Sequence, residues 1–230
     1  MSIAELKKSV CDANLDLVFH GLVKMTFGNA SAIDRDAGLV VIKPSGVSYE
    51  KMKPRDMVVV NLAAEVVEGD FKPSVDLPTH LRLYEAFPSI GGVAHSHSHF
   101  ATCWAQACRA IPCLGTTHAD YFYGEVPITE ALSKEEVGDH YERAIGDSIV
   151  KVFNQRDPLE CPGVLVANHA PFAWGKTVAD AVEHARVLEE VAQLALHTLT
   201  IHSEKGPIAD HLLDKHFLRK HGDHAYYGQR

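Results

Sequence analysis

Two histidines one residue apart, His95 and His97, have the residue type and spacing of metal ligands. They follow a short apolar segment at residues 91–94, which predicts an extended strand. Because side chains alternate across a strand, residues i and i+2 share a face, so these two imidazoles are expected to lie close together. A chain with 15 histidines also contains such pairs by chance, and a pair needs a third ligand to make a metal site.

A third histidine, His169, ends a second apolar segment at residues 163–168. Pro162 before it and Pro171 after it predict a short buried strand that opens into a turn, with His169 at the strand tip. Three histidines supplied by two strands leave one coordination position open, which is typical of a catalytic rather than a structural zinc site. We therefore expect a catalytic metal centre.

Two polar loops next to predicted strands contain glycine, at residues 26–31 and 43–46. A glycine allows a close backbone approach, and an asparagine beside it offers both a donor and an acceptor. Such loops can present N–H groups and hydroxyls to an anion, although each alone is also typical of an ordinary turn. Their candidate anion-binding residues are Gly28, Asn29, Lys43, Ser45 and Gly46.

Ser74 and Asp76 come directly before a predicted helix that ends near Phe87. The start of a helix carries unpaired N–H groups and a partial positive charge, so it favours an anion. An acidic side chain at this position can instead orient a cation. The two residues are therefore further candidates for the same site.

The elements expected to position these residues alternate between helices and strands. Capping boxes predict helix starts at Ser2 with Glu5 and at Ser133 with Glu136. Residues 115–124 form a predicted polar loop containing Asp120. Further helices are expected at residues 100–108, 177–202 and 207–220, and strands at residues 39–42, 57–62 and 65–69. This order predicts a layered α/β fold, and the strand neighbours that resemble hairpins indicate that its sheet is not purely parallel.

Composition narrows the class of protein. The chain has 230 residues, of which 46% are hydrophobic and 23% charged, which fits one soluble domain over residues 1–230. A formal charge of −8 argues against nucleic acid and against an anionic membrane as partners. The sequence shows neither a signal peptide nor an apolar run long enough to span a membrane. Its five cysteines form no CxxC motif, which predicts free thiols in a reducing, cytoplasmic location.

These motifs together closely resemble the L-ribulose-5-phosphate 4-epimerases of the class II aldolase family. The resemblance covers essentially the whole chain. It rests on the motifs Gly28-Asn29-Ala30-Ser31, Lys43-Pro44-Ser45-Gly46, Ser74-Val75-Asp76, His95-Ser96-His97, the Asp120 loop, His169 with residues 171–175, residues 215–222 and the terminal Tyr226-Tyr227-Gly228-Gln229. It implies a three-layer α/β/α fold with a central, mostly antiparallel β-sheet.

The resemblance also implies roles for individual residues. His95, His97 and His169 would bind a divalent metal, usually zinc, with Asp76 as a further ligand. Asp120 and Tyr227 would be the acid/base pair, reaching in from a neighbouring subunit of a homotetramer with sites at the subunit interfaces. The substrate phosphate would be held by Gly28, Asn29, Lys43, Ser45, Gly46, Ser74 and the backbone of Val75.

The implied reaction interconverts L-ribulose 5-phosphate and D-xylulose 5-phosphate, two phosphorylated ketopentoses. Inverting a carbon with no acidic hydrogen requires a redox cofactor or cleavage of a carbon–carbon bond, and no GxGxxG motif supports a nicotinamide. Retro-aldol cleavage of C3–C4 requires an electron sink, which a bound metal supplies as a Lewis acid. Lys43 as a Schiff-base nucleophile is a competing sink that the metal makes redundant.

Two alternatives remain at this point. The first is a class II aldolase that releases its products, of the L-fuculose or L-rhamnulose 1-phosphate type; such aldolases carry glutamate where this chain has Asp76. The second is a non-catalytic domain such as the head of adducin, which would not need three converging histidines. The chain also departs from the epimerase pattern, with Val75 in place of serine and Ala170 in place of glycine.

Overall fold

The computed structural model describes residues 1–138 and 140–227. Over these residues the strands form one seven-stranded sheet in the order β4-β3-β2-β1-β5-β7-β6. Every neighbouring pair of strands is antiparallel. The strands are β1 (Asn29–Asp34), β2 (Leu39–Ile42), β3 (Val58–Asn61), β4 (Val66–Glu68), β5 (Gly92–His95), β6 (Gly163–Leu165) and β7 (Pro171–Gly175).

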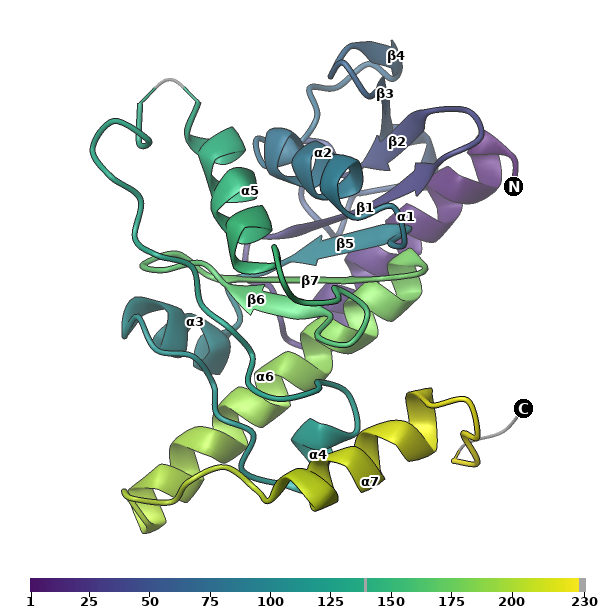
Figure 1. The fold of residues 1–230 in the computed structure, drawn as a ribbon. Coiled ribbons are helices and arrows are strands. Elements are labelled where there is room, and N and C mark those ends of the chain that lie inside the picture. The colour runs from purple at the N-terminus through teal and green to yellow at the C-terminus, as the bar shows by residue number, and fades with distance from the viewer. Residues whose placement is uncertain (139, 228–230) are drawn as a thin grey trace.

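Helices cover both faces of this sheet (Figure 1). Helices α2 and α5 lie against one face, while α1 and the first half of α6 lie against the other. None of the helices in the described part is long and apolar enough to cross a membrane. The helices are α1 (Ile3–Phe19), the 3-10 helix η1 (Pro54–Asp56), α2 (Leu77–Ala86), α3 (His99–Gln106), α4 (Thr116–Ala119), α5 (Tyr141–Val152), α6 (Val178–Ile201) and α7 (Asp210–His221).

Alternation along the strands builds two hydrophobic layers. In β2, Val40 and Ile42 pack in the cluster that includes α2 and α5, whereas Val41 between them packs with α1. Successive side chains of a strand point to opposite faces, so burial of both faces requires this near-continuous apolar sequence. The predicted three-layer α/β/α fold with a mostly antiparallel sheet is therefore confirmed, and the sheet is antiparallel throughout.

The start of β1, the end of β5 and the start of β7 lie side by side at one end of these strands. Asn29 of β1 pairs with His95 of β5, and His95 pairs in turn with Phe172 of β7. The turn before β1 approaches β5 closely: a Cβ at Gly28, whose φ is +80°, would lie 2.7 Å from the carbonyl oxygen of His95. Glycine is the residue that tolerates both this conformation and this contact. The loops at this edge thus meet in one place.

The capping box predicted at Ser2 with Glu5 begins α1. The predicted helix at residues 177–202 is α6, and the structure shows a capping box of Thr177 with Asp180 at its start. The prediction at Ser133 is wrong: Ser133 and Glu136 exchange both capping hydrogen bonds, yet residues 134–137 form turns and α5 begins at Tyr141. These turn residues are mostly exposed, so no buried face extends the turn into a helix.

Other local predictions need correction. Residues 171–175, for which no strand was predicted, form β7 in the interior of the sheet. Pro171 is compatible with this because it occupies the first position of the strand. Thr116–Ala119, expected within a loop, form the short helix α4. The last helix begins at Asp210, three residues after Pro207, and ends before Gly222 as predicted.

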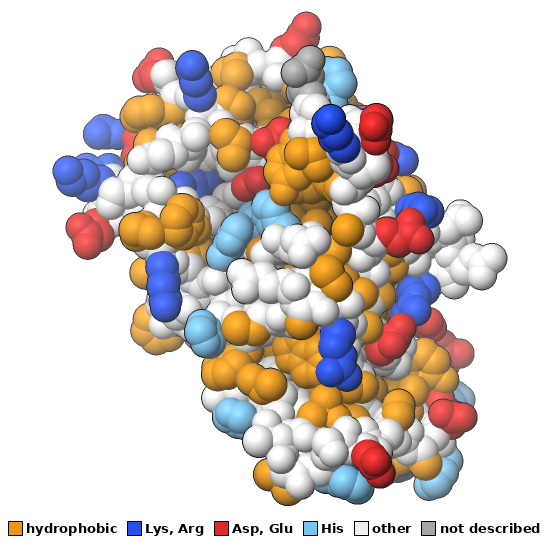
Figure 2. Space-filling view, turned by 90° about the vertical axis from the view of Figure 1, so that its left-hand side faces the viewer, with side chains coloured by type: hydrophobic (Ala, Val, Ile, Leu, Met, Phe, Trp, Pro, Cys, Tyr) orange, Lys and Arg blue, Asp and Glu red, His pale blue; other side chains and the backbone are white. Residues whose placement is uncertain are grey.

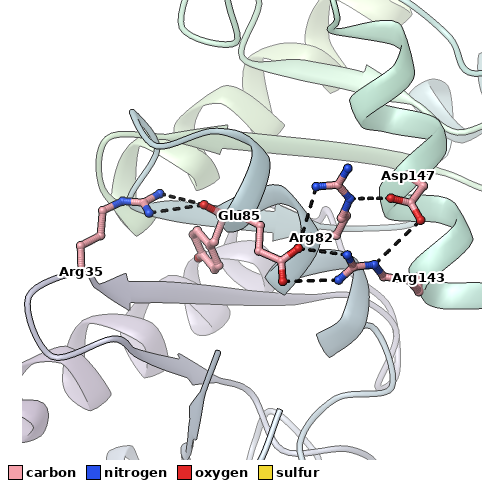
Figure 3. A network of polar contacts seen from close by, with 6 residues as sticks. Arg35, Arg82, Glu85, Arg143 and Asp147 are labelled. Atoms are coloured by element: carbon pink, nitrogen blue, oxygen red, sulfur yellow. Dashed lines mark hydrogen bonds and ion pairs between the residues drawn. The ribbon is translucent and has the colours of Figure 1, made fainter. Parts of the chain in front are cut away.

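Helices α2 and α5 are held together by a network of ion pairs (Figure 3). Arg82 of α2 pairs with Asp147 of α5, and Arg143 of α5 pairs with Glu85 of α2 at 3.0 Å. Beneath these pairs the helices pack closely, because a Cβ at Gly146 would lie 2.7 Å from Cβ of Arg82. The two helices are thereby fixed relative to each other.

Candidate active site

The three predicted ligands converge at the shared edge of β1, β5 and β7. The ring centroids of His95 and His97 are 5.0 Å apart, and His169 lies 5.1 Å and 5.0 Å from them. One nitrogen of each ring lies within 4.8 Å of the other two. Strand β5 ends at His95, so His97 lies just beyond the strand rather than within it, but the predicted closeness of their rings is confirmed.

Surrounding groups orient the rings for this arrangement. Nδ1 of His95 donates to the carbonyl oxygen of Pro171 at 2.9 Å, and the ring stacks on Phe172 at 4.1 Å. A carbonyl only accepts, so Nδ1 carries the hydrogen and the neutral ring keeps Nε2 free to bind a cation. That Nε2 lies 3.3 Å from Nε2 of His169. The donor set therefore fits a divalent cation.

The protonation behaviour of the other two histidines agrees with a ligand role. Burial, together with the nearby His95 and His97, lowers the pKa of His169 to about 4. Burial and His95 likewise lower the pKa of His97. Ligand imidazoles must be neutral, so lowered pKa values favour metal binding near neutral pH.

Asp76 joins the metal side of the site to the anion side. Asn29 donates from Nδ2 to Asp76 at 2.6 Å and to the hydroxyl of Ser74 at 3.0 Å. Burial works to raise the pKa of Asp76, but His95, His80 and the Asn29 hydrogen bond outweigh it and lower that pKa. The carboxylate therefore stays charged beside the histidines, while Oδ1 of Asn29 is buried without a partner among the described residues.

The second polar loop supplies a buried cation. Lys43 is 2% exposed, and its ammonium donates to the carbonyl of Pro44 at 3.2 Å and lies 4.8 Å from the centre of the Tyr49 ring. Burial lowers the pKa of Lys43, and Asp76 opposes this shift. The loop is held against the Ser74 segment, because the Ser74 amide donates to the Lys43 carbonyl at 2.9 Å. A buried ammonium with unused donors suits an anionic group.

The three histidines, Asp76, Asn29, Ser74 and Lys43 line one cavity of about 380 Å³. Figure 2 shows histidine side chains gathered in a hollow on this side of the molecule, with hydrophobic side chains around it. The structure thus brings together the eleven predicted residues Gly28, Asn29, Lys43, Ser45, Gly46, Ser74, Val75, Asp76, His95, His97 and His169. Val75 is 65% exposed where it lines the cavity.

Asp120 and Tyr227 do not line this cavity. Asp120 follows α4 and accepts three hydrogen bonds from Arg219 of α7, at 3.1, 2.9 and 2.8 Å, and one from His216 at 3.1 Å. Tyr227 stacks on the same Arg219, whose guanidinium carbon lies 4.6 Å from the ring centre. The two residues are joined to each other through Arg219, and in Figure 1 α4 and α7 lie well away from the end of β5.

Sequence reasoning missed cavity residues that come from elsewhere in the chain. Thr26 and Phe27 line the cavity, as do Tyr141 and Glu142 from the start of α5. The hydroxyl of Tyr141 is hydrogen-bonded to Nδ1 of His169 at 3.0 Å. No motif marks Tyr141, because its contact depends on how α5 packs on α2. Phe27 could have been found from its place beside Gly28.

Comparison with protein families matches residues 8–196 to the family described as Class II Aldolase and Adducin N-terminal domain. The chain belongs to this family. Class II aldolase members are metal-dependent, and the cluster of His95, His97 and His169 is able to hold a metal here.

Curated members of the class II aldolase family are similar along the whole chain. An L-ribulose-5-phosphate 4-epimerase of Salmonella paratyphi C is 57% identical over 226 residues, which cover 98% of this chain and 99% of that protein. The L-ribulose-5-phosphate 4-epimerase of Salmonella typhi has the same identity and the same coverage.

Solved structures of the family support the fold. An L-fuculose 1-phosphate aldolase aligns with a TM-score of 0.78 at 24% identity, covering 92% of this chain and 94% of that one. The L-fuculose-1-phosphate aldolase from Thermus thermophilus aligns with a TM-score of 0.69 at 24% identity, covering 88% of this chain and 99% of that one.

Proposed function

We propose that this chain is an L-ribulose-5-phosphate 4-epimerase that inverts C4 by breaking and re-forming the C3–C4 bond. The observation that carries the proposal is 57% identity over 98% of the chain to proteins of that name. The aldolase alternative is supported by a likeness at 24% identity, which concerns the fold alone. The adducin-like alternative does not account for three imidazoles that converge on one point.

In this proposal the cavity binds the two ends of the substrate differently. His95, His97 and His169, with Asp76 beside them, would hold a divalent cation, for which we propose Zn²⁺ because the ligands are imidazole nitrogens and a carboxylate. When bound, the cation would withdraw electron density from the C2 and C3 oxygens of the ketose. Asn29, Ser74 and the buried Lys43 would hold the phosphate, together with Gly28, Ser45, Gly46 and the Val75 backbone.

Holding the phosphate keeps the two-carbon aldehyde in place while it turns and presents its other face. One group must then exchange a proton with the C4 oxygen on each side. Asp120 and Tyr227 are the proposed pair. Burial works to raise the pKa of Asp120, but hydrogen bonds from Arg219 and His216 lower it, so the carboxylate is charged and able to accept a proton.

The position of this pair supports a site shared between subunits. Asp120 and Tyr227 lie outside the cavity of their own chain, and exposed apolar side chains of Met25, Phe27 and Phe71 lie in or near the loops at the phosphate side. We propose a homotetramer in which each cavity receives Asp120 and Tyr227 from a neighbour. We further propose that residues 1–230 act as one domain, in the cytoplasm, in pentose metabolism.

The test is a single incubation of the purified protein with L-ribulose 5-phosphate. We expect D-xylulose 5-phosphate to form with almost no free glycolaldehyde phosphate. The His97→Asn variant should lose bound metal and about 1,000-fold or more of the turnover, whereas the matched His99→Asn variant should retain both. Release of glycolaldehyde phosphate as the main product would replace the epimerase proposal with the aldolase alternative.

A further inference from the structure

The rings of His95 and His169 are held in place by different contacts. His95 lies at the end of β5, is buried, and is fixed by the Pro171 carbonyl and by stacking on Phe172. His169 lies in the turn between β6 and β7, after Asn168 with a φ of +60°, and its ring is 6.5 Å from that of Phe172. Its orientation therefore depends on another contact.

That contact is the hydroxyl of Tyr141, 3.0 Å from Nδ1 of His169. A metal at Nε2 requires that nitrogen to be bare, so the neutral ring carries its hydrogen on Nδ1, where only an acceptor satisfies it. The Tyr141 oxygen is such an acceptor. Tyr141 lies at the wall of the cavity.

Tyr141 is itself held in place through α2. It is the first residue of α5, and the Thr79 hydroxyl of α2 donates to the carbonyl of the next residue, Glu142, at 2.5 Å. The ion pairs of Figure 3 and the close packing at Gly146 join the same two helices. Asp76 directly precedes α2, and Tyr141 begins α5. The packing of these two helices against each other therefore positions both residues at the cavity.

We propose that Tyr141 is a positioning residue of the metal centre, which accepts the Nδ1 hydrogen of His169 and so aims Nε2 of that ring at the cation. This inference rests on the proposed function, because it assumes that the three histidines bind metal. It assigns Tyr141 no direct ligation of the metal. It predicts that removing one hydroxyl weakens metal binding while the fold stays intact.

The test is the affinity for Zn²⁺, measured by competition with a chromophoric chelator, in four proteins. Tyr141→Phe should bind Zn²⁺ about 10- to 100-fold more weakly than the unchanged protein. Tyr123→Phe is the matched control, because it removes a tyrosine hydroxyl that bonds Asp214 on the surface. His169→Asn removes the ligand itself and should bind most weakly.

Two further measurements separate positioning from general stability. The absorption spectrum of the Co²⁺-loaded Tyr141→Phe protein should differ from that of the unchanged protein, while the metal-free proteins melt at the same temperature. Thr79→Val, which loosens the start of α5 without touching His169, should weaken Zn²⁺ binding in the same direction by a smaller factor.

The outcomes are distinguishable. Equal Zn²⁺ affinity and equal Co²⁺ spectra for Tyr141→Phe and the unchanged protein would overturn the role of Tyr141 and leave the metal site standing. If the unchanged protein binds Zn²⁺ no better than His169→Asn, the proposed metal centre is wrong and the inference fails with it.

Discussion

The cavity and the Asp120 region prepare their ionisable groups in opposite ways. In and beneath the cavity, burial lowers the pKa values of His80, His97 and His169, which keeps these imidazoles neutral. Near α7, hydrogen bonds from Arg219 and His216 outweigh burial and lower the pKa of Asp120, which keeps that carboxylate charged. One region therefore has neutral imidazoles, which suit a cation, and the other has a charged carboxylate.

The cavity and the Asp120 region also differ in how far their polar groups are already paired. The cavity contains groups with unused capacity, such as Oδ1 of Asn29 and the ammonium of Lys43. Asp120, in contrast, already has a guanidinium and an imidazole as partners within its own chain. The cavity is therefore equipped to bind a ligand by itself, whereas in our proposal the Asp120 region supplies a prearranged group to the cavity of a neighbouring subunit. This difference is what an active site divided between subunits requires.

The largest expected effect tests whether the two regions meet between copies of the chain. His97→Asn and Asp120→Asn should each be nearly inactive alone, the second by about 100- to 10,000-fold. Subunits mixed at random combine an intact cavity with a neighbour's intact Asp120 in about one site in four, so the mixture should recover about a quarter of the unchanged activity. Turnover of the mixed and reassembled variants measures this.

A mixture that stays inactive, in which mass spectrometry confirms mixed oligomers, would place Asp120 and the cavity that it serves within one chain. An Asp120→Asn variant that is active by itself would remove Asp120 from the reaction. Asp120→Asn alone should bind Zn²⁺ as the unchanged protein does, because Asp120 does not line the cavity. Tyr227→Phe should behave in the same way.

An intermediate effect concerns the neutral imidazoles under the cavity. His80 is fully buried, its Nδ1 lies 2.7 Å from the Ser31 hydroxyl, and burial lowers its pKa to about 3. Between about pH 6.5 and pH 3, His80 binds a proton in the unfolded chain but not in the folded chain. The contribution of His80 to the free energy of unfolding should therefore fall by about 1.4 kcal/mol for each pH unit of acidification.

Denaturant unfolding at a series of pH values, compared between the unchanged protein and His80→Asn, measures this slope. The variant should be less stable at pH 7, and its stability should depend less on pH below 6.5. Parallel pH curves for the two proteins would show that His80 takes up no proton on unfolding. In that case the contrast between neutral cavity groups and a charged Asp120 would not extend beneath the site.

The smallest expected effect lies at the cavity rim. Val75→Ser adds a hydroxyl next to Ser74, where one hydrogen bond to the substrate phosphate would contribute about 0.5 to 1.5 kcal/mol. We expect KM for L-ribulose 5-phosphate to fall by about two- to tenfold, with little change in kcat. Val66→Ser, an exposed change on β4, is the matched control. An unchanged KM would place the phosphate away from Val75.

Sequence patterns located most of the cavity because its groups lie within short motifs. His95 and His97 are neighbours in the chain, and Asn29 and Ser74 lie beside turns and helix starts that local rules describe. The same rules failed at Ser133, where the capping bonds form but no buried face extends the helix. The contact of Tyr141 with His169 depends on the packing of α5 against α2, which no local pattern encodes.

The shared edge of β1, β5 and β7 also has a consequence for which sugars fit. Asn29 and His95 are paired on adjacent strands, and the side chain of Asn29 contacts both Ser74 and Asp76. The groups proposed to bind the cation and those proposed to bind the phosphate therefore belong to one hydrogen-bonded framework, which keeps the distance between them fixed. Such a cavity would select substrates by length. A sugar one carbon longer or shorter between its carbonyl and its phosphate would reach either the cation or the phosphate-binding groups, but not both.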